Sequence, residues 1–186
     1  MIAAVDVTAE FAAELDACHD AVGVGLVGSA HGLAIASSRR LAGRPVPGCP
    51  GLTWASAPRS ADGVLAEFGS RLVSLHWEVV RTQLDRVVAR LGERTSEGSA
   101  LLHRQLVQGA IADVAIALSD TGGLLDLPGN GQRRWQAHLG LVAAGRKLLT
   151  LFGGESFVAD GPGSALYLAE LLGNVYLHPG PGSSRG

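Results

Sequence analysis

The longest periodic stretch of the chain is SADGVLAEFGSRLVSLHWEVVRTQLDRVVARLGER, residues 60–94. Its apolar residues recur at intervals of three, four and seven, at Val73, Val80, Leu84, Val87 and Leu91. This spacing puts them on one face of a helix. The small and polar residues from Ser60 to Gly63 offer an N-cap. The sequence therefore predicts a helix that runs from this cap to about Arg94.

Helical spacing continues toward the C-terminus in three further segments. They run from Leu102 to the pair Gly122-Gly123, from Leu139 to the pair Gly153-Gly154, and from about Ser164 to Val175. A glycine after the last periodic residue is a common helix stop. Residues 127–131, with one proline and two glycines, predict a turn between the first two segments.

The N-terminal third is less periodic. Residues 7–40 allow one helix or two, although four glycines weaken that prediction, and residues 45–60 hold four prolines and predict a loop. Sustained period-2 alternation is missing, so we expect an all-α fold, an antiparallel helical bundle. The expected division is a helical appendage and loop at 1–60, the bundle at 61–178 and a disordered tail at 179–186.

Composition narrows the range of partners. The formal net charge is −2 and the sequence has no basic run, which argues against nucleic acid and against anionic membranes. The longest apolar run, residues 21–36, is short for a bilayer, and the N-terminus lacks the basic region of a signal peptide. Two isolated cysteines, Cys18 and Cys49, suit a reducing compartment. We expect a cytoplasmic protein.

Two familiar ligand motifs do not find their usual context. Residues 23–28 spell Gly-x-Gly-x-x-Gly, but a dinucleotide site needs a strand before it, and here a helix is expected. Close helix packing by small residues is the favoured interpretation. The six histidines show no metal-binding spacing. His76 stands next to Trp77 beside the apolar stripe, so it is either a candidate acid or base or a helix-surface histidine.

Two blocks of residues carry a more specific signal. The first comprises Leu84-Asp85, Glu93-Arg94, Gly98, Gln105 and Ala112-Asp113. The second comprises Thr150, Gly153-Gly154, Phe157, Pro162, Leu166 and Tyr176-Leu177. Without any gap, these spacings resemble the C-terminal helical-bundle domain of acyl-CoA dehydrogenases over about residues 64–178. The chain looks like a truncated form of that family, because it is too short to add the family's flavin-holding β-domain.

The resemblance implies a role in binding FAD. In the family, the arginine and the Gly-Gly turn reach across a dimer interface to the diphosphate and adenosine of the neighbour's flavin, which suits a guanidinium and backbone N–H groups. The corresponding residues here are Arg94, Gly153 and Gly154, with Gln105 keeping one family amide and Thr150 replacing the other. We expect FAD to be shared with a partner subunit, and none to be bound by the chain alone.

The same resemblance puts the catalytic base in question. The family's glutamate, which removes the α-proton of the acyl thioester, falls on Leu177, and leucine cannot accept a proton. Some members place the base on the first bundle helix, at a position that is Phe68 here, with Glu67 beside it. Glu67 and His178 are therefore further candidates for an acid or base.

Three hypotheses remain. The chain is a truncated acyl-CoA dehydrogenase-like subunit that pairs with itself or with a flavin-bearing partner acting on an acyl thioester. Alternatively, it is a flavin-free enzyme or binding protein for an acyl or polyketide-like small molecule in a biosynthetic pathway, using an interhelical cleft with His76, Glu67 or His178. The third hypothesis is a structural dimerisation module. Whether the chain is an enzyme stays open between them.

Overall fold

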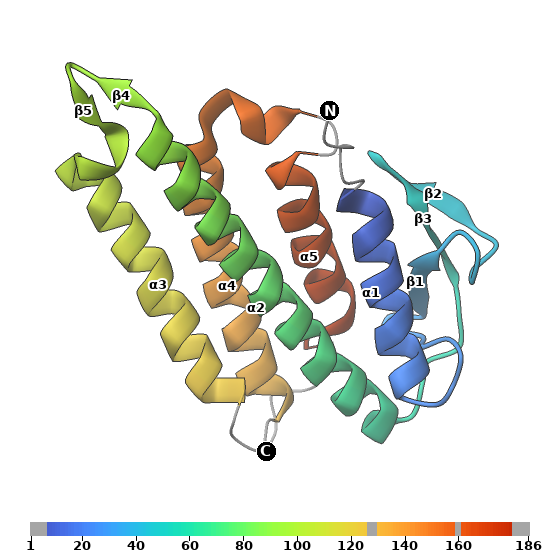
Figure 1. Ribbon diagram of the computed structural model, residues 1–186. Helices are drawn as coiled ribbons and strands as arrows, with labels where there is room; N and C mark the ends of the chain where they lie inside the picture. The colour runs from blue at the N-terminus through green and yellow to red at the C-terminus, as the bar shows by residue number, and fades with distance from the viewer. Residues whose placement is uncertain (1–6, 126–129, 159–160, 180–186) are drawn as a thin grey trace.

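The structure is a computed structural model that describes residues 7–125, 130–158 and 161–179. Its elements are α1 (Val7–Ala21), β1 (Leu33–Ser37), β2 (Arg44–Val46), β3 (Cys49–Ser56), α2 (Asp62–Glu93), β4 (Thr95–Ser96), β5 (Ser99–Ala100), η1 (Leu101–His103), α3 (Gln105–Leu125), α4 (Gly131–Phe152), η2 (Gly153–Phe157) and α5 (Pro162–Tyr176). Helices η1 and η2 are short 3-10 helices. In Figure 1 the long helices lie roughly parallel or antiparallel to one another.

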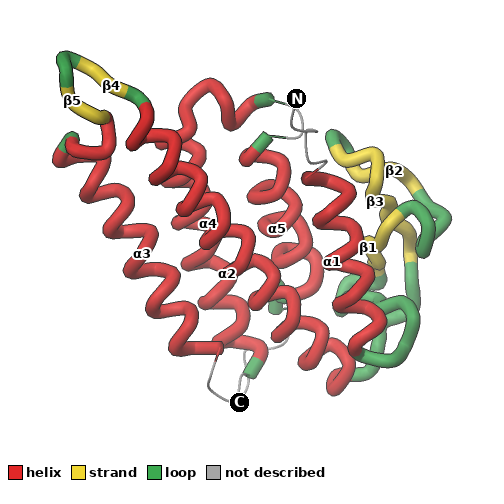
Figure 2. Tube along the Cα trace, viewed as in Figure 1, coloured by secondary structure: helices red, strands yellow, loops and turns green. Residues whose placement is uncertain are grey.

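The prediction of an all-α fold is wrong. The chain is 67% helical, but β1, β3 and β2 form a three-stranded antiparallel sheet, so the class is α+β. Figure 2 shows this sheet beside α1. Strand β1 pairs with β3 from Leu33↔Ser56 to Ser37↔Leu52. Four of the five β1 residues are buried, so both faces of the strand are covered and the alternation that reveals a half-exposed strand is missing.

The helix predicted over residues 7–40 is correct only for its first half. Helix α1 ends at Ala21, and Gly23 and Gly25 follow with φ values of 72° and 69°, a left-handed conformation that glycine adopts without strain. The Gly-x-Gly-x-x-Gly motif therefore forms a turn and does not mediate helix packing. The loop predicted over residues 45–60 is also wrong, because Pro50 and Gly51 lie inside β3.

Helix α2 is the centre of the molecule and contacts α1, α3, α4 and α5. Its bounds match the predicted helix, although Ser60 is not the cap. Ala61 occupies the N-cap position without a side-chain bond, and the Ser60 hydroxyl instead accepts the Gly28 N–H at 3.0 Å. At the other end, the Arg94 N–H donates to the Arg90 carbonyl, as expected for the helix end.

The later helices follow the predicted pattern with small differences. Helix α4 ends at Phe152, and Gly153 follows as its C-cap with a φ of 64°, at the predicted stop, whereas α3 continues past Gly122-Gly123 to Leu125. Asn130 caps α4 by accepting the Arg133 N–H at 2.9 Å. Residues 127–129 of the predicted turn and residues 180–186 of the predicted tail lie outside the described residues.

The N-terminal segment shares a hydrophobic core with the bundle. Leu15 of α1 and Leu52 of β3 pack in one cluster with Phe68 of α2 and Leu172 of α5. The Tyr176 hydroxyl joins the two parts further, since it accepts the Ile35 N–H at 2.9 Å and donates to the Val27 carbonyl at 3.1 Å. A second cluster fills the space between α2, α3, α4 and α5. The sheet and α1 therefore cover the N-terminal half of α2.

Candidate functional site

The residues of the two sequence blocks that the resemblance assigns to FAD lie at one end of the bundle. Arg94 caps the C-terminus of α2, Gln105 begins α3, and Gly153-Gly154 follow α4. Figure 1 shows these three helix ends at the same end of the molecule. An ion pair between Arg90 of α2 and Glu155 of η2 connects two of them directly.

Arg94 is exposed at this end, and its guanidinium forms no ion pair with any residue that the structure describes. Its carbonyl accepts the Leu101 N–H at 2.8 Å, which closes the β4–β5 hairpin onto the helix end. Glu97 and Gly98 form the hairpin turn with φ values of 54° and 79°, both in the left-handed region that a tight hairpin of this kind requires. The backbone of Arg94 is thus fixed by hydrogen bonds, while its exposed side chain is available to contact a ligand.

The glycine pair also faces open space. A Cβ added at Gly153 or Gly154 would meet no atom within 4 Å. The Gly153 N–H already donates to the Leu149 carbonyl, so this amide is engaged in the helix end. Thr150, which replaces the family's glutamine, turns its hydroxyl back to the Arg146 carbonyl at 3.2 Å. Of the residues that the resemblance assigns to FAD, Arg94 and Gln105 have exposed polar side chains.

The positions that the resemblance assigns to a catalytic base lie toward the other end of α2. Leu177 is buried in the bundle core, and a Cβ at Gly69 would come within 3.0 Å of it. Phe68 is 0% exposed, because the His19 ring stacks on it at 4.7 Å and the Tyr176 ring meets its edge at 4.8 Å. Both positions are filled by apolar side chains. The chain therefore offers no carboxylate at either of them.

His76 belongs to a buried pair, so it is not the helix-surface histidine that the sequence analysis allowed. It is 3% exposed, and its Nδ1 lies 3.2 Å from Nδ1 of His138 on α4. The Nε2 of His138 lies 3.2 Å from the Asn174 side-chain oxygen, which fixes a proton on that nitrogen and makes Nδ1 of His138 the acceptor. Burial, with His138 adding to it, lowers the pKa of His76 to about 3. The pair is therefore neutral and structural at neutral pH.

The three candidate acids or bases do not converge. His178 is exposed and contacts the Trp135 ring at 5.0 Å and the His31 ring at 5.9 Å. Trp135 in turn contacts His138 at 5.2 Å, so His178 is separated from His76 by two rings. Glu67 faces a different surface and accepts a hydrogen bond from Arg71 at 2.9 Å. No shared site for general acid–base chemistry is formed by these three residues.

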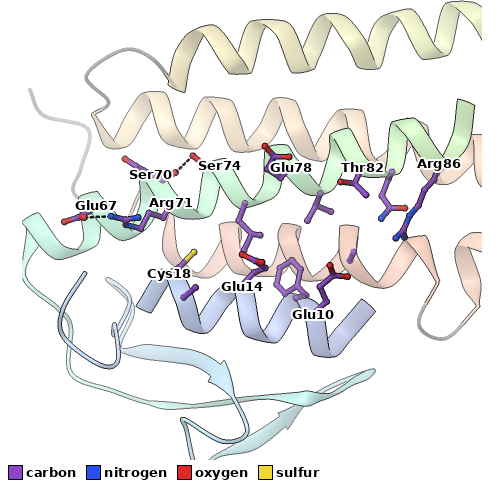
Figure 3. Close-up of a pocket in the computed structure, with 16 residues that line it drawn as sticks. Glu10, Glu14, Cys18, Glu67, Ser70, Arg71, Ser74, Glu78, Thr82 and Arg86 are labelled. Carbon is purple, nitrogen blue, oxygen red and sulfur yellow. Dashed lines mark hydrogen bonds and ion pairs between the residues drawn. The ribbon is translucent and has the colours of Figure 1, made fainter. Parts of the chain in front are cut away.

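A groove of about 790 Å³ runs between α1 and α2. Figure 3 shows Glu10, Glu14 and Cys18 of α1 across from Ser74, Glu78 and Thr82 of α2. Burial raises the pKa of the Cys18 thiol, with nearby Arg71 opposing the effect, so this cysteine is not activated as a nucleophile. The groove is thus a concave surface lined by apolar, hydroxyl and charged side chains.

Sequence reasoning missed His138 and Gln83, although each carried a detectable signal. His138 falls in register with Leu141 and Leu148 on the buried face of α4, and Gln83 falls between Val80 and Val87 on that of α2. A polar residue on an apolar stripe marks a buried polar group. The groove itself could not be predicted, because it depends on how α1 packs against α2.

Comparison with family models, with curated proteins and with solved structures finds no match to this chain. Among the described residues, no group of three histidine, cysteine or acidic side chains is placed to hold a metal ion. None of the helices described combines the length and hydropathy that crossing a membrane requires. The functional assignment therefore rests on the residues and their arrangement.

Proposed function

We propose that this chain is an acyl-CoA dehydrogenase-like subunit that completes the FAD site of a flavin-bearing partner. One observation carries the proposal. The structure brings Arg94, Gln105 and Gly153-Gly154 to one exposed end of the bundle. These residues belong to the two sequence blocks whose spacing resembles that of the family. A flavin of a second subunit can be reached from such an end.

The chemistry of this end suits a diphosphate. Arg94 supplies a planar guanidinium without an ion-pair partner among the described residues, and Gln105 adds an exposed amide. Hydrogen bonds from a guanidinium to phosphate oxygens are charge-assisted and can be bidentate. The Gly154 position has no side chain to obstruct an approaching ligand. FAD, when bound by the partner, would supply the redox chemistry.

The partner must also supply the base. With Leu177 and Phe68 at the two base positions, this chain cannot remove the α-proton of an acyl thioester. We therefore expect the purified chain to be colourless and inactive as an acyl-CoA oxidant. Tightly held flavin in the chain purified alone would contradict the proposal.

The direct test is FAD retention by the complex of this chain with a co-expressed flavin-bearing acyl-CoA dehydrogenase-like subunit. Arg94→Ala should weaken retention by about 1.5–3 kcal/mol, or roughly ten- to a hundredfold, through loss of a charge-assisted contact. Arg94→Lys should restore only part, because an ammonium cannot form the fork. Arg39→Ala, at an exposed arginine after β1, is the matched control.

If Arg94 is only an exposed arginine at a helix end, its contribution is about 0.3–1 kcal/mol to the helix dipole and nothing to flavin. Equal FAD occupancy in the wild type, Arg94→Ala and Arg94→Lys at matched folding stability would remove the proposal. The flavin-free hypothesis would then become the stronger one.

A further inference from the structure

The groove between α1 and α2 (Figure 3) is lined on α2 by residues between Glu67 and Arg86, and Arg94 is not among its lining residues. The proposed FAD contact does not involve this groove, so the proposed function does not account for it. Its lining is mixed: apolar side chains such as Phe11 and Val79 are flanked by carboxylates and hydroxyls.

Gln83 is the first indication of a ligand. The side chain lines the groove and is 2% exposed, yet its oxygen has no hydrogen-bond partner among the described residues. A buried acceptor without a donor is uncommon in a native fold, since the group has lost its water. A ligand in the groove that carries a donor would satisfy it.

Several other polar groups of the lining also have acceptor atoms that are not used. The Ser70 and Ser74 hydroxyls donate to the carbonyls of Ala66 and Ser70 in their own helix, at 3.1 Å and 3.2 Å, so their protons are engaged and their lone pairs remain. The Glu10 and Glu14 carboxylates form no ion pair with the described residues. The groove therefore has hydrogen-bond acceptors along its length, which favours a ligand rich in N–H donors.

The charge of the lining also favours a cationic ligand. Four glutamates and two arginines line the groove. Glu67 is paired with Arg71 at 2.9 Å, and Glu78 is paired at 2.7 Å with Arg81, which is not a lining residue. Glu10 and Glu14 are the lining carboxylates without an ion pair among the described residues. Arg86 is the remaining lining cation, and it has no such partner among the described residues. The two unpaired carboxylates outnumber this arginine, so the field in the groove is net negative, attracts cations and repels carboxylates and phosphates.

The dimensions favour a linear molecule. Ser70 and Gln83 are 13 residues apart on α2, so the groove extends for ~20 Å at the rise of an α-helix. Phe11, Leu75 and Val79 provide apolar contacts between the acceptors. Methylene segments can pack on these side chains while charged groups reach the acceptors on either side.

We propose that this groove binds a linear aliphatic polyamine, whose ammonium groups contact Glu10, Glu14 and the Gln83 oxygen and whose methylene segments lie on Phe11 and Val79. The acceptors are distributed along the groove, so a ligand with several ammonium groups fits it better than one with a single charged head. The site is independent of the proposed FAD contact.

The test is calorimetric titration of the purified full chain with three probes at low salt: spermidine, octylamine and octanoate. Spermidine should bind about tenfold more tightly than either of the others, and added salt should weaken its binding. Octylamine binding as tightly as spermidine would overturn the polyamine assignment. Tighter binding of octanoate, or no binding of spermidine at millimolar concentration, would overturn it as well.

Variants test whether the binding occurs in the groove. The double variant Glu10→Gln/Glu14→Gln changes exposed positions of α1 and should weaken spermidine binding about tenfold. Glu93→Gln, at the exposed end of α2 outside the groove, should leave binding unchanged. Equal binding by the double variant and the control would refute the site.

Gln83→Leu separates a ligand role from a structural one. Leucine removes the unpaired buried oxygen, so the free protein should be at least as stable as the wild type in urea denaturation, while spermidine binding falls. Gln83→Met, whose side chain has nearly the same length as glutamine, controls for the change in side-chain shape. It should also keep the folding stability and weaken spermidine binding. Lower folding stability with unchanged binding in both variants would show that Gln83 only supports the fold.

Discussion

The buried pair of His76 and His138 should make the protein sensitive to acid. The pKa of His76 is lowered from 6.5 to about 3 by burial and by His138, so the folded protein keeps this imidazole neutral where the unfolded chain binds a proton. Its effect on stability is absent well above pH 6.5, grows as the pH falls through 6.5, and levels off below about pH 3. Each pH unit in that window costs about 1.4 kcal/mol.

The size of the effect follows from these values. Between about pH 7.5 and about pH 5, His76 alone should lower the free energy of unfolding by about 2 kcal/mol. Burial also lowers the pKa of His138 and of His19, so both act in the same direction. The assay is urea denaturation at the two pH values.

A variant isolates the contribution of His76 from all other titrations. His76→Asn places an amide donor near the position of Nδ1, so the contact with His138 is partly kept while the proton is no longer taken up. Its loss of stability over the same pH interval should be smaller than that of the wild type by about 2 kcal/mol. His103→Asn, at an exposed histidine of η1, is the control. An equal loss in the wild type and His76→Asn would refute the reasoning.

Three further predictions concern the Tyr176 hydroxyl, Gly173 and the oligomeric state. Tyr176→Phe should lower the free energy of unfolding by about 1–3 kcal/mol, because it leaves the buried Ile35 N–H and Val27 carbonyl without their partner, whereas Tyr167→Phe at an exposed position should have little effect. Gly173→Ala should lower the free energy of unfolding by about 1–3 kcal/mol, because the added Cβ would overlap the His138 imidazole. Gly109→Ala, which has open space in α3, should raise it by up to about 1 kcal/mol. Urea denaturation measures both changes. The protein should sediment as a dimer or tetramer. Leu106 and Ile116 of α3 are 90% and 58% exposed, and replacing both with lysine should favour the monomer. A wild-type monomer at micromolar concentration would contradict this prediction.

The helices α2 to α5 could be predicted because each buries one face. Val80, Val87 and Leu91 repeat on the side of α2 that meets the other helices, and the period of that repeat identifies the helix. Strand β1 could not be predicted in this way. Its residues Ala34 and Ile35 are both buried although they point to opposite faces, so the strand shows no alternation. Strand β3 begins with Cys49, Pro50 and Gly51, a composition typical of a loop.

The candidate sites divide in the same way. The resemblance in spacing predicted Arg94, Gln105 and Gly153-Gly154 as candidate residues, and their joint position at one end of the bundle depends on the lengths of α3 and α4, which the periodicity approximated. The groove arises from long-range packing between α1 and α2, and the His76–His138 contact joins α2 to α4. Local periodicity carries information about which face is buried but not about which residue lies opposite. Contacts between elements that are distant in the sequence therefore could not be predicted from it.

The length of α2 also limits which partner can complete a flavin site. Phe68 and Arg94 are 26 residues apart on one continuous helix, a distance of ~39 Å. One chain therefore cannot hold the diphosphate with Arg94 and present a group from the Phe68 end to the same bound substrate. In a homodimer each chain would receive its neighbour's Arg94, but every copy would have Leu177 and Phe68 where a base is needed. Self-pairing thus could not restore proton removal, so the proposed function requires a different, glutamate-bearing subunit as partner. If only a homo-oligomer forms with every flavin-bearing candidate present, the proposal of a shared FAD site loses its chemical basis.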